Sequence, residues 1–143
     1  MVIVYADMVA DIFHSGHVKF LERAAQLGDF LIVGINSGED AASYKRYPII
    51  PLEDRIIVIE SCKPVSRVIA PCPLIVTEEF INFNNIDIVV HAHDKDDTSY
   101  DFMYRDPIRL GKFVRLDYTP GISTTEIIQR CKAIPYTQPV VTD

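Results

Sequence analysis

The 143-residue chain has no tryptophan, few cysteines and no long hydrophobic run. Its three cysteines, Cys62, Cys72 and Cys131, are odd in number and lack the spacing of a metal site, so we expect reduced thiols in a cytoplasmic protein. No apolar run approaches the ~20 residues that cross a bilayer. No basic leader precedes the first apolar run, so we expect no signal peptide and no membrane partner. A net charge of −6 without any basic run argues against a nucleic-acid partner.

Three common catalytic signatures are also missing. The chain contains no P-loop, no Gly-x-Gly-x-x-Gly string and no Gly-x-Ser-x-Gly elbow. Each string builds a particular backbone cradle or an exposed nucleophile. P-loop ATPase, dinucleotide-binding and serine acyl-transfer activities therefore have no support in the sequence.

Short apolar runs alternate with segments of helical periodicity along the whole chain. Expected strands cover 2–5, 30–35, 65–70, 86–91 and 113–116. Expected helices cover 18–27, 51–62 and 77–83, and a last one begins at Ser123; 37–47 is a loop or short helix and 93–107 a loop. This alternation predicts an α/β fold: a Rossmann-like, doubly wound parallel sheet of about five strands in a single domain, 1–134, with a tail at 135–143.

Ligands of such sheets bind beyond the carboxyl ends of the strands. Here those loops are 6–17, 36–48, 91–107 and 117–123. Every residue with candidate chemistry lies in or next to one of them.

The tetrad His14-Ser15-Gly16-His17 stands where the first strand gives way to the first helix. Gly16 lets an anion approach the backbone, and the free amides of the helix start face it. Two imidazoles three residues apart can donate to charge that develops on a phosphate. An isolated His-x-Gly-His would more often cap a helix, but its place at a strand–helix junction favours a phosphate site.

A second helix start carries hydroxyl side chains. Ser123 and Glu126 fit a capping box, which needs no ligand, but Gly121 and the hydroxyls of Thr124 and Thr125 suit the β- and γ-phosphates of a nucleotide. Lys45 and Arg46 follow the second strand. They are either solvated charges or, for Lys45, a clamp on the transferred phosphoryl group, with Arg55 a weaker candidate.

A turn rich in histidine and aspartate follows the fourth strand. Its residues crowd into one turn with no matching cluster elsewhere, so we expect no protein metal site; they are His91, His93, Asp94, Asp96 and Asp97. Asp94 is a candidate nucleotide contact, with Mg²⁺ arriving on the triphosphate. Tyr100 and Tyr104 either pack without a ligand or lie over a substrate ammonium group.

These strings together resemble the cytidylyltransferase family of the nucleotidyltransferase α/β phosphodiesterase superfamily over roughly residues 2–132. The similar strings are Tyr5-Ala6-Asp7, 11–17, 27–34, Tyr44-Lys45-Arg46, Glu53-Asp54-Arg55 and 121–125. The stretch 70–80 is most similar to the choline-phosphate and ethanolamine-phosphate members.

The resemblance implies an enzyme in which a phosphomonoester attacks the α-phosphorus of CTP and pyrophosphate leaves. The product is a CDP-alcohol of phospholipid biosynthesis. The catalytic residues are then His14, His17 and Lys45. The implied nucleotide contacts are Val9, Ala10, Asp11, His14, Gly16, His17, His93, Asp94, Thr119, Gly121, Ile122, Ser123 and Thr124. Acceptor contacts are Lys45, His93, Tyr100 and Tyr104, and the family implies Mg²⁺ and a homodimer.

The chain departs from the family pattern at three places. Tyr118 replaces an arginine, so a cation on the phosphates is missing unless Arg115 or Arg46 substitutes. Met8 and Ala10 replace a glycine and an aromatic residue, and His93 replaces an Asp or Asn. The absence of tryptophan excludes a Trp-containing ammonium cage. It favours phosphoethanolamine, or a related amino-alkyl phosphate or phosphonate, over phosphocholine. The alternatives are glycerol 3-phosphate or another acceptor or base, and a non-catalytic nucleotide-binding domain.

Overall fold

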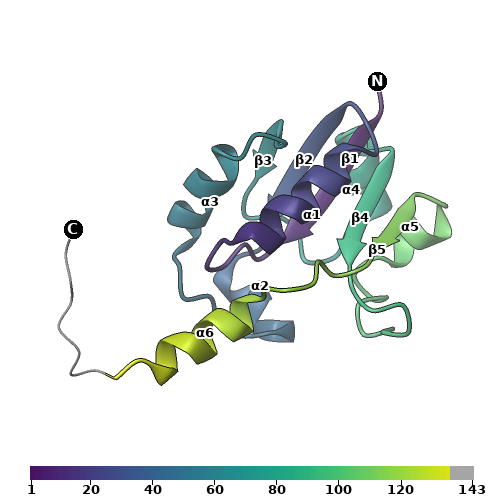
Figure 1. Cartoon of the computed structure of the whole chain (residues 1–143). Helices are drawn as coiled ribbons and strands as arrows, with labels where there is room; N and C mark the ends of the chain where they lie inside the picture. Colours follow the sequence, from purple (N-terminus) through teal and green to yellow (C-terminus); the bar gives the residue numbers. More distant parts are fainter. Residues whose placement is uncertain (136–143) are drawn as a thin grey trace.

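Five parallel strands form one sheet in the order β3-β2-β1-β4-β5 in the computed structural model, which describes residues 1–135 (Figure 1). The strands are β1 (Ile3–Met8), β2 (Phe30–Ile35), β3 (Arg67–Ile69), β4 (Ile88–Ala92) and β5 (Phe113–Leu116). The helices are α1 (Ser15–Ala25), α2 (Gly38–Tyr44), α3 (Leu52–Glu60), α4 (Glu78–Phe83), α5 (Arg105–Arg109) and α6 (Thr124–Ala133). The predicted single α/β domain with a five-stranded parallel sheet is confirmed.

Helices cover both faces of this sheet, which is why its strands read as continuous apolar runs. One face buries alternate strand residues such as Val4, Ala6 and Val33 under α1 and α3. The opposite face buries Tyr5 and Ile32, together with Ile81 of α4. Side chains alternate across a strand, so each strand feeds both cores.

The strand order reverses between β1 and β4. The chain moves outward from β1 to β2 and β3, then returns to the other side of β1 to place β4 and β5. Such a reversal opens a crevice beyond the carboxyl ends of the two central strands. This crevice is where the functional residues gather.

Several expected elements differ in extent: α1 begins at Ser15 rather than at Val18, and β3 covers only Arg67–Ile69 of the expected 65–70. Two further differences bear on the site. β1 runs three residues beyond Tyr5, because Asp7 and Met8 continue the register against β2. The expected loop 93–107 ends in the short helix α5, which packs against α4; the Asp106 carboxylate accepts the Glu78 N–H at 2.8 Å. Both differences arise from contacts with segments distant in the sequence, and the local periodicity of the sequence carries no information about such contacts.

Helix α6 extends away from the sheet and buries none of its residues (Figure 1). The expected tail lies outside the described residues apart from Pro135. Within residues 1–135, no helix has the length and apolarity needed to cross a membrane.

Candidate active site

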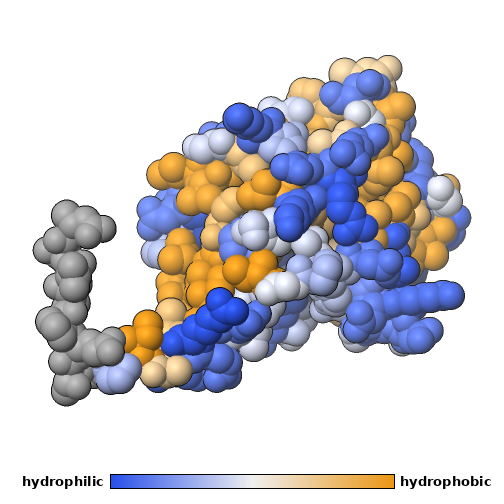
Figure 2. All heavy atoms as spheres, viewed as in Figure 1, coloured by the Kyte–Doolittle hydropathy of each residue, from blue (hydrophilic) through white to orange (hydrophobic). Residues whose placement is uncertain are grey.

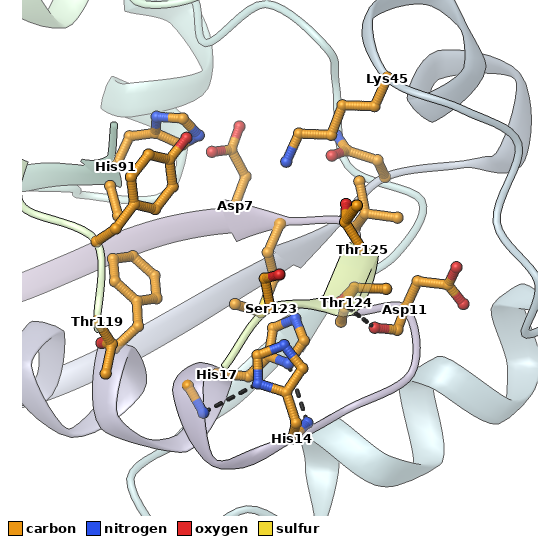
Figure 3. Close-up of a pocket in the computed structure, with 18 of the residues that line it drawn as sticks. Asp7, Asp11, His14, His17, Lys45, His91, Thr119, Ser123, Thr124 and Thr125 are labelled. Atoms are coloured by element: carbon orange, nitrogen blue, oxygen red, sulfur yellow. Dashed lines mark hydrogen bonds between the residues drawn. The ribbon is translucent and has the colours of Figure 1, made fainter. Parts of the chain in front are cut away.

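A cavity of about 660 Å³ opens at the carboxyl ends of the central strands (Figure 3). Its walls come from the segments after β1, β2, β4 and β5, which are far apart in the sequence. The volume falls in the range of small-molecule sites, ~300–1,000 Å³.

His14 and His17 form a reciprocal cap at the start of α1. The Gly16 N–H donates to His14 Nδ1 at 3.0 Å, and the His14 N–H donates to His17 Nδ1 at 3.1 Å. A neutral imidazole that accepts at Nδ1 carries its proton on Nε2. The cap therefore leaves an Nε2–H donor on each of two rings that line the cavity (Figure 3).

Both rings are neutral at pH 7. Burial lowers the pKa of His17 to about 4, and the neighbouring His14 and Lys45 add to this effect. Burial also lowers the pKa of His14. Capping and phosphate donation are thus compatible roles here, because each uses a different ring nitrogen.

Gly16 is required by close packing against this cap. A Cβ at position 16 would lie 2.7 Å from His14 Cε1 and 2.9 Å from Nδ1, so any side chain displaces the His14 ring. The same absence of a side chain opens the backbone to an anion.

Asp7 lies at the end of β1 and is only 5% exposed. Its Oδ1 accepts a hydrogen bond of 2.5 Å from the Tyr104 hydroxyl. Burial raises the pKa of Asp7 to about 6, against the lowering effects of that hydrogen bond and of Lys45. The Lys45 ammonium extends across the cavity toward this carboxylate (Figure 3), so the cavity can hold a negative and a positive charge close together.

The segment after α2 carries Lys45 and Arg46 to the rim of the cavity. Desolvation lowers the pKa of Lys45, while Asp7 raises it and Arg46 lowers it. Both residues are exposed at the rim, while the Lys45 ammonium itself reaches into the cavity toward Asp7 (Figure 3).

Asp11, which also lines the cavity, and Arg55, which does not, hold this segment in place. The Asp11 carboxylate accepts the N–H groups of Ile49 and Ile50, both at 2.9 Å. The buried Arg55 guanidinium donates to the carbonyls of Ile50, Val9 and Asn36 at 2.8–2.9 Å. We call these two side chains the loop clamp.

The start of α6 closes the opposite wall. Ser123 Oγ accepts the Glu126 N–H at 3.1 Å, whereas the Glu126 carboxylate pairs with Arg130 at 2.7 Å instead of completing the expected capping box. Thr124 Oγ1 donates to the Asp11 carbonyl at 3.1 Å (Figure 3). This bond joins the start of α6 to the loop that precedes α1.

His91 near the end of β4, rather than His93 just after it, faces the cavity. The two Nδ1 atoms lie 2.9 Å apart in a hydrogen bond, and His93 is buried behind its neighbour. Tyr100 packs on both rings, with centroids 4.7 Å and 5.2 Å away. Burial lowers the pKa of His91 to about 3, so this ring is also neutral.

Most of the residues singled out by sequence analysis converge on the cavity. Those that line it are Val9, Ala10, Asp11, His14, Gly16, His17, Lys45, Tyr104, Thr119, Ile122, Ser123 and Thr124. Four residues do not line it: His93, Asp94, Tyr100 and Gly121. Asp94 is exposed, and Gly121 supplies a positive φ of 103° in the turn before α6. Within residues 1–135, no three His, Cys, Asp or Glu side chains converge as a metal site.

Sequence reasoning gave no binding role to Asp7 or His91, which both line the cavity. A signal for each was present. Each is a polar residue near the carboxyl end of an otherwise apolar central strand, which is where such sheets place ligand contacts.

Comparison with known proteins connects this geometry with a family. The model of the cytidylyltransferase-like family matches residues 6–130. The ethanolamine-phosphate cytidylyltransferase of Dictyostelium discoideum is 34% identical over 90% of this chain and 37% of its own length. The choline-phosphate cytidylyltransferase A of Rattus norvegicus is 35% identical over 89% of this chain and 35% of its own length.

A solved structure shares the fold. The lipopolysaccharide core biosynthesis protein from Thermoplasma volcanium GSS1 superimposes with a TM-score of 0.68 at 26% identity, over 83% of this chain and 98% of its own. The chain spans about a third of the length of the curated relatives it matches.

Proposed function

The chain belongs to the cytidylyltransferase-like family, and from this premise we propose that it transfers CMP from CTP to a small phosphorylated amino alcohol. An oxygen of the acceptor phosphate attacks the α-phosphorus of CTP. The bond from that phosphorus to the bridging oxygen breaks, and pyrophosphate leaves with the bonding electron pair. The products are a CDP-alcohol and pyrophosphate.

One observation carries the proposal: two neutral histidines are held by backbone bonds with their Nε2–H groups free. Donors that are fixed before the reaction stabilise developing charge without a reorganisation cost. Here His14 and His17 donate to the α-phosphate oxygens, where negative charge builds up in the transition state. Lys45 bridges the two reacting phosphates from the opposite rim.

The nucleotide is held along the α1–α6 side of the cavity. Thr119 Oγ1 is buried without a hydrogen-bond partner among the described residues and lines the cavity, so it is available to the nucleotide. The α6 start supplies Ser123 and Thr124 beside the phosphates. Helix N-termini favour anions.

The Asp7 end of the cavity suits the ammonium group of phosphoethanolamine. Asp7 Oδ1 accepts the Tyr104 hydroxyl, and the Asp7 carboxylate lines the cavity. A primary ammonium has three N–H donors and can bind a buried carboxylate directly, whereas a quaternary ammonium relies on aromatic faces. This difference supports phosphoethanolamine ahead of phosphocholine.

Mg²⁺, the homodimer and the cytoplasmic location belong to the same proposal. Mg²⁺ prefers phosphate oxygens and water, and it would be held by the triphosphate. Hydrophobic side chains gather on the face between α3 and α6 (Figure 2). Ile49 and Ile134, which are 59% and 61% exposed, line one groove together. An exposed apolar surface supports contact with a second copy, and sedimentation velocity should give twice the mass of one chain.

The test is pyrophosphate release with Mg²⁺ and CTP across four acceptors: phosphoethanolamine, phosphocholine, 2-aminoethylphosphonate and glycerol 3-phosphate. We expect the fastest release with phosphoethanolamine, and none without an acceptor. ATP in place of CTP tests the base. Release with none of these acceptors, for either nucleotide, would refute the proposed activity.

A further inference from the structure

The cavity offers little fixed positive charge for its proposed ligand. A nucleoside triphosphate carries three to four negative charges at neutral pH. The three histidines that line the cavity are His14, His17 and His91, and burial lowers the pKa of each, so all three are neutral. Any positive charge that compensates the triphosphate must therefore come from the lysines and arginines around the cavity.

Two of the nearby arginines already have partners. Arg55 donates to three backbone carbonyls and belongs to the loop clamp. Arg115 donates to the His93 carbonyl and to the Asp117 carboxylate, both at 2.7 Å, and does not line the cavity. Neither guanidinium can turn to a ligand without breaking these bonds.

Tyr118 supplies no charge at its place on the cavity wall. Burial raises the pKa of its hydroxyl to about 12, so the side chain is neutral throughout the physiological range. The wall formed by 118–125 thus contributes hydroxyl groups and amides but no cation.

Arg46 is different from these residues. It lines the cavity beside Lys45, its side chain is exposed, and it makes no hydrogen bond or ion pair with any described residue. The segment that carries Arg46 is held in place, because Asp11 and Arg55 form hydrogen bonds with its backbone at Ile49 and Ile50. A guanidinium presents a planar fork of N–H donors that matches phosphate oxygens.

We propose that Arg46 binds the triphosphate and supplies the permanent positive charge that the 118–125 wall lacks. This inference rests on the proposed function, since it takes a nucleoside triphosphate as the ligand. Two neighbouring cations then have different roles: Lys45 contacts the reacting phosphates, and Arg46 binds the phosphate chain of the nucleotide. A purely solvated arginine would have no effect on binding.

The experiment compares ligand binding by wild type, Arg46→Gln, Arg46→Lys and the matched control Arg67→Gln. Arg67 is exposed on β3 and does not line the cavity. The probes are CTP, cytidine and inorganic tripolyphosphate, titrated by calorimetry at low and high salt. Circular dichroism checks that each variant is folded, as expected for surface substitutions.

We expect Arg46→Gln to weaken CTP and tripolyphosphate binding about tenfold or more, as for loss of a hydrogen bond to a charged group. Binding of cytidine should not change. Arg46→Lys should fall in between, and Arg67→Gln should match wild type. The loss should shrink at high salt, because screening weakens the phosphate contact.

Equal affinity of wild type and Arg46→Gln for CTP and tripolyphosphate would overturn the inference. The proposed function fails separately, if wild type releases no pyrophosphate with any acceptor. Tripolyphosphate reports on Arg46 even then, since it contains neither the base nor the acceptor.

Discussion

At the scale of single residues, the cavity contains polar side chains whose burial lowers the stability of the folded chain unless neighbouring groups form hydrogen bonds with them. Asp7 is the clearest case, because a carboxylate is buried at the end of a central strand and accepts a hydrogen bond from Tyr104. The folded chain holds its proton up to about pH 6, whereas an ordinary Asp loses it near 3.8.

The raised pKa of Asp7 makes stability depend on pH. Between about pH 4 and pH 6 the folded state binds a proton that the unfolded chain has released, so stability falls as pH rises through this interval. Above pH 6 the penalty is on the order of 2–3 kcal/mol. We expect Asp7→Asn to raise the unfolding free energy at pH 7 by up to this amount and to flatten its pH profile. The same variant should lose affinity for phosphoethanolamine.

Chemical denaturation at pH 4, 5, 6 and 7 measures the first effect, and KM for the acceptor measures the second. A variant that is less stable than wild type at pH 7 would contradict the interpretation of Asp7 as a strained group kept for binding.

His17 tests the transition-state role. His17→Ala removes one fixed donor, so kcat should fall by a factor on the order of 10²–10³. It also removes half of the α1 cap, which costs about 1 kcal/mol and leaves the protein folded. Thermal unfolding controls for that loss. Unchanged turnover at saturating CTP would remove His17 from the mechanism.

At the scale of elements, hydrogen bonds between loops, more than the neighbouring helices, hold the site residues in position. The loop clamp ties the segment after α2 to the segments after β1 and β2. Thr124 ties the start of α6 to the same place, the Asp11 carbonyl. The position of Lys45 is therefore set by contacts across the cavity mouth.

Arg55→Met should break the clamp. Three backbone carbonyls lose their donor, and each buried polar group left unsatisfied costs about 1–3 kcal/mol. We expect a loss of about 3 kcal/mol or more in the free energy of unfolding, measured in urea. The control Arg105→Met, at an exposed residue of α5, should stay within about 0.5 kcal/mol of wild type. A similar, small change in both variants would show that the clamp contributes nothing.

At the scale of the whole molecule, the cavity is shared by four segments that only the folded sheet brings together. A ligand that binds there stabilises the native state alone. At a CTP concentration of 100 times Kd, linkage gives about 2.7 kcal/mol. We expect CTP to raise the melting temperature in a concentration-dependent way, in wild type and in Arg67→Gln alike. An unchanged melting temperature at millimolar CTP would contradict the nucleotide site.

The sequence by itself determined the repeating strand–helix order, the loops that bear the chemistry and the two helix starts marked by 14–17 and 123–126. These features are local, because apolar periodicity and capping residues act within a few positions of the chain. The predicted end of β1 was wrong because pairing with β2 extends the strand through Asp7. The predicted loop before β5 was wrong because part of it forms α5, which contacts α4.

Only the tertiary structure decided which polar residues share one cavity. Tyr104 meets Asp7 across 97 positions, and Thr124 meets Asp11 across 113. It also decided that His91 rather than His93 faces the cavity, that Arg55 and Arg115 have partners, and that both histidines of 14–17 keep Nε2–H free. The physical reason is that burial and hydrogen-bond partners, which set charge and tautomer, come from segments whose meeting depends on the order of strands in the sheet.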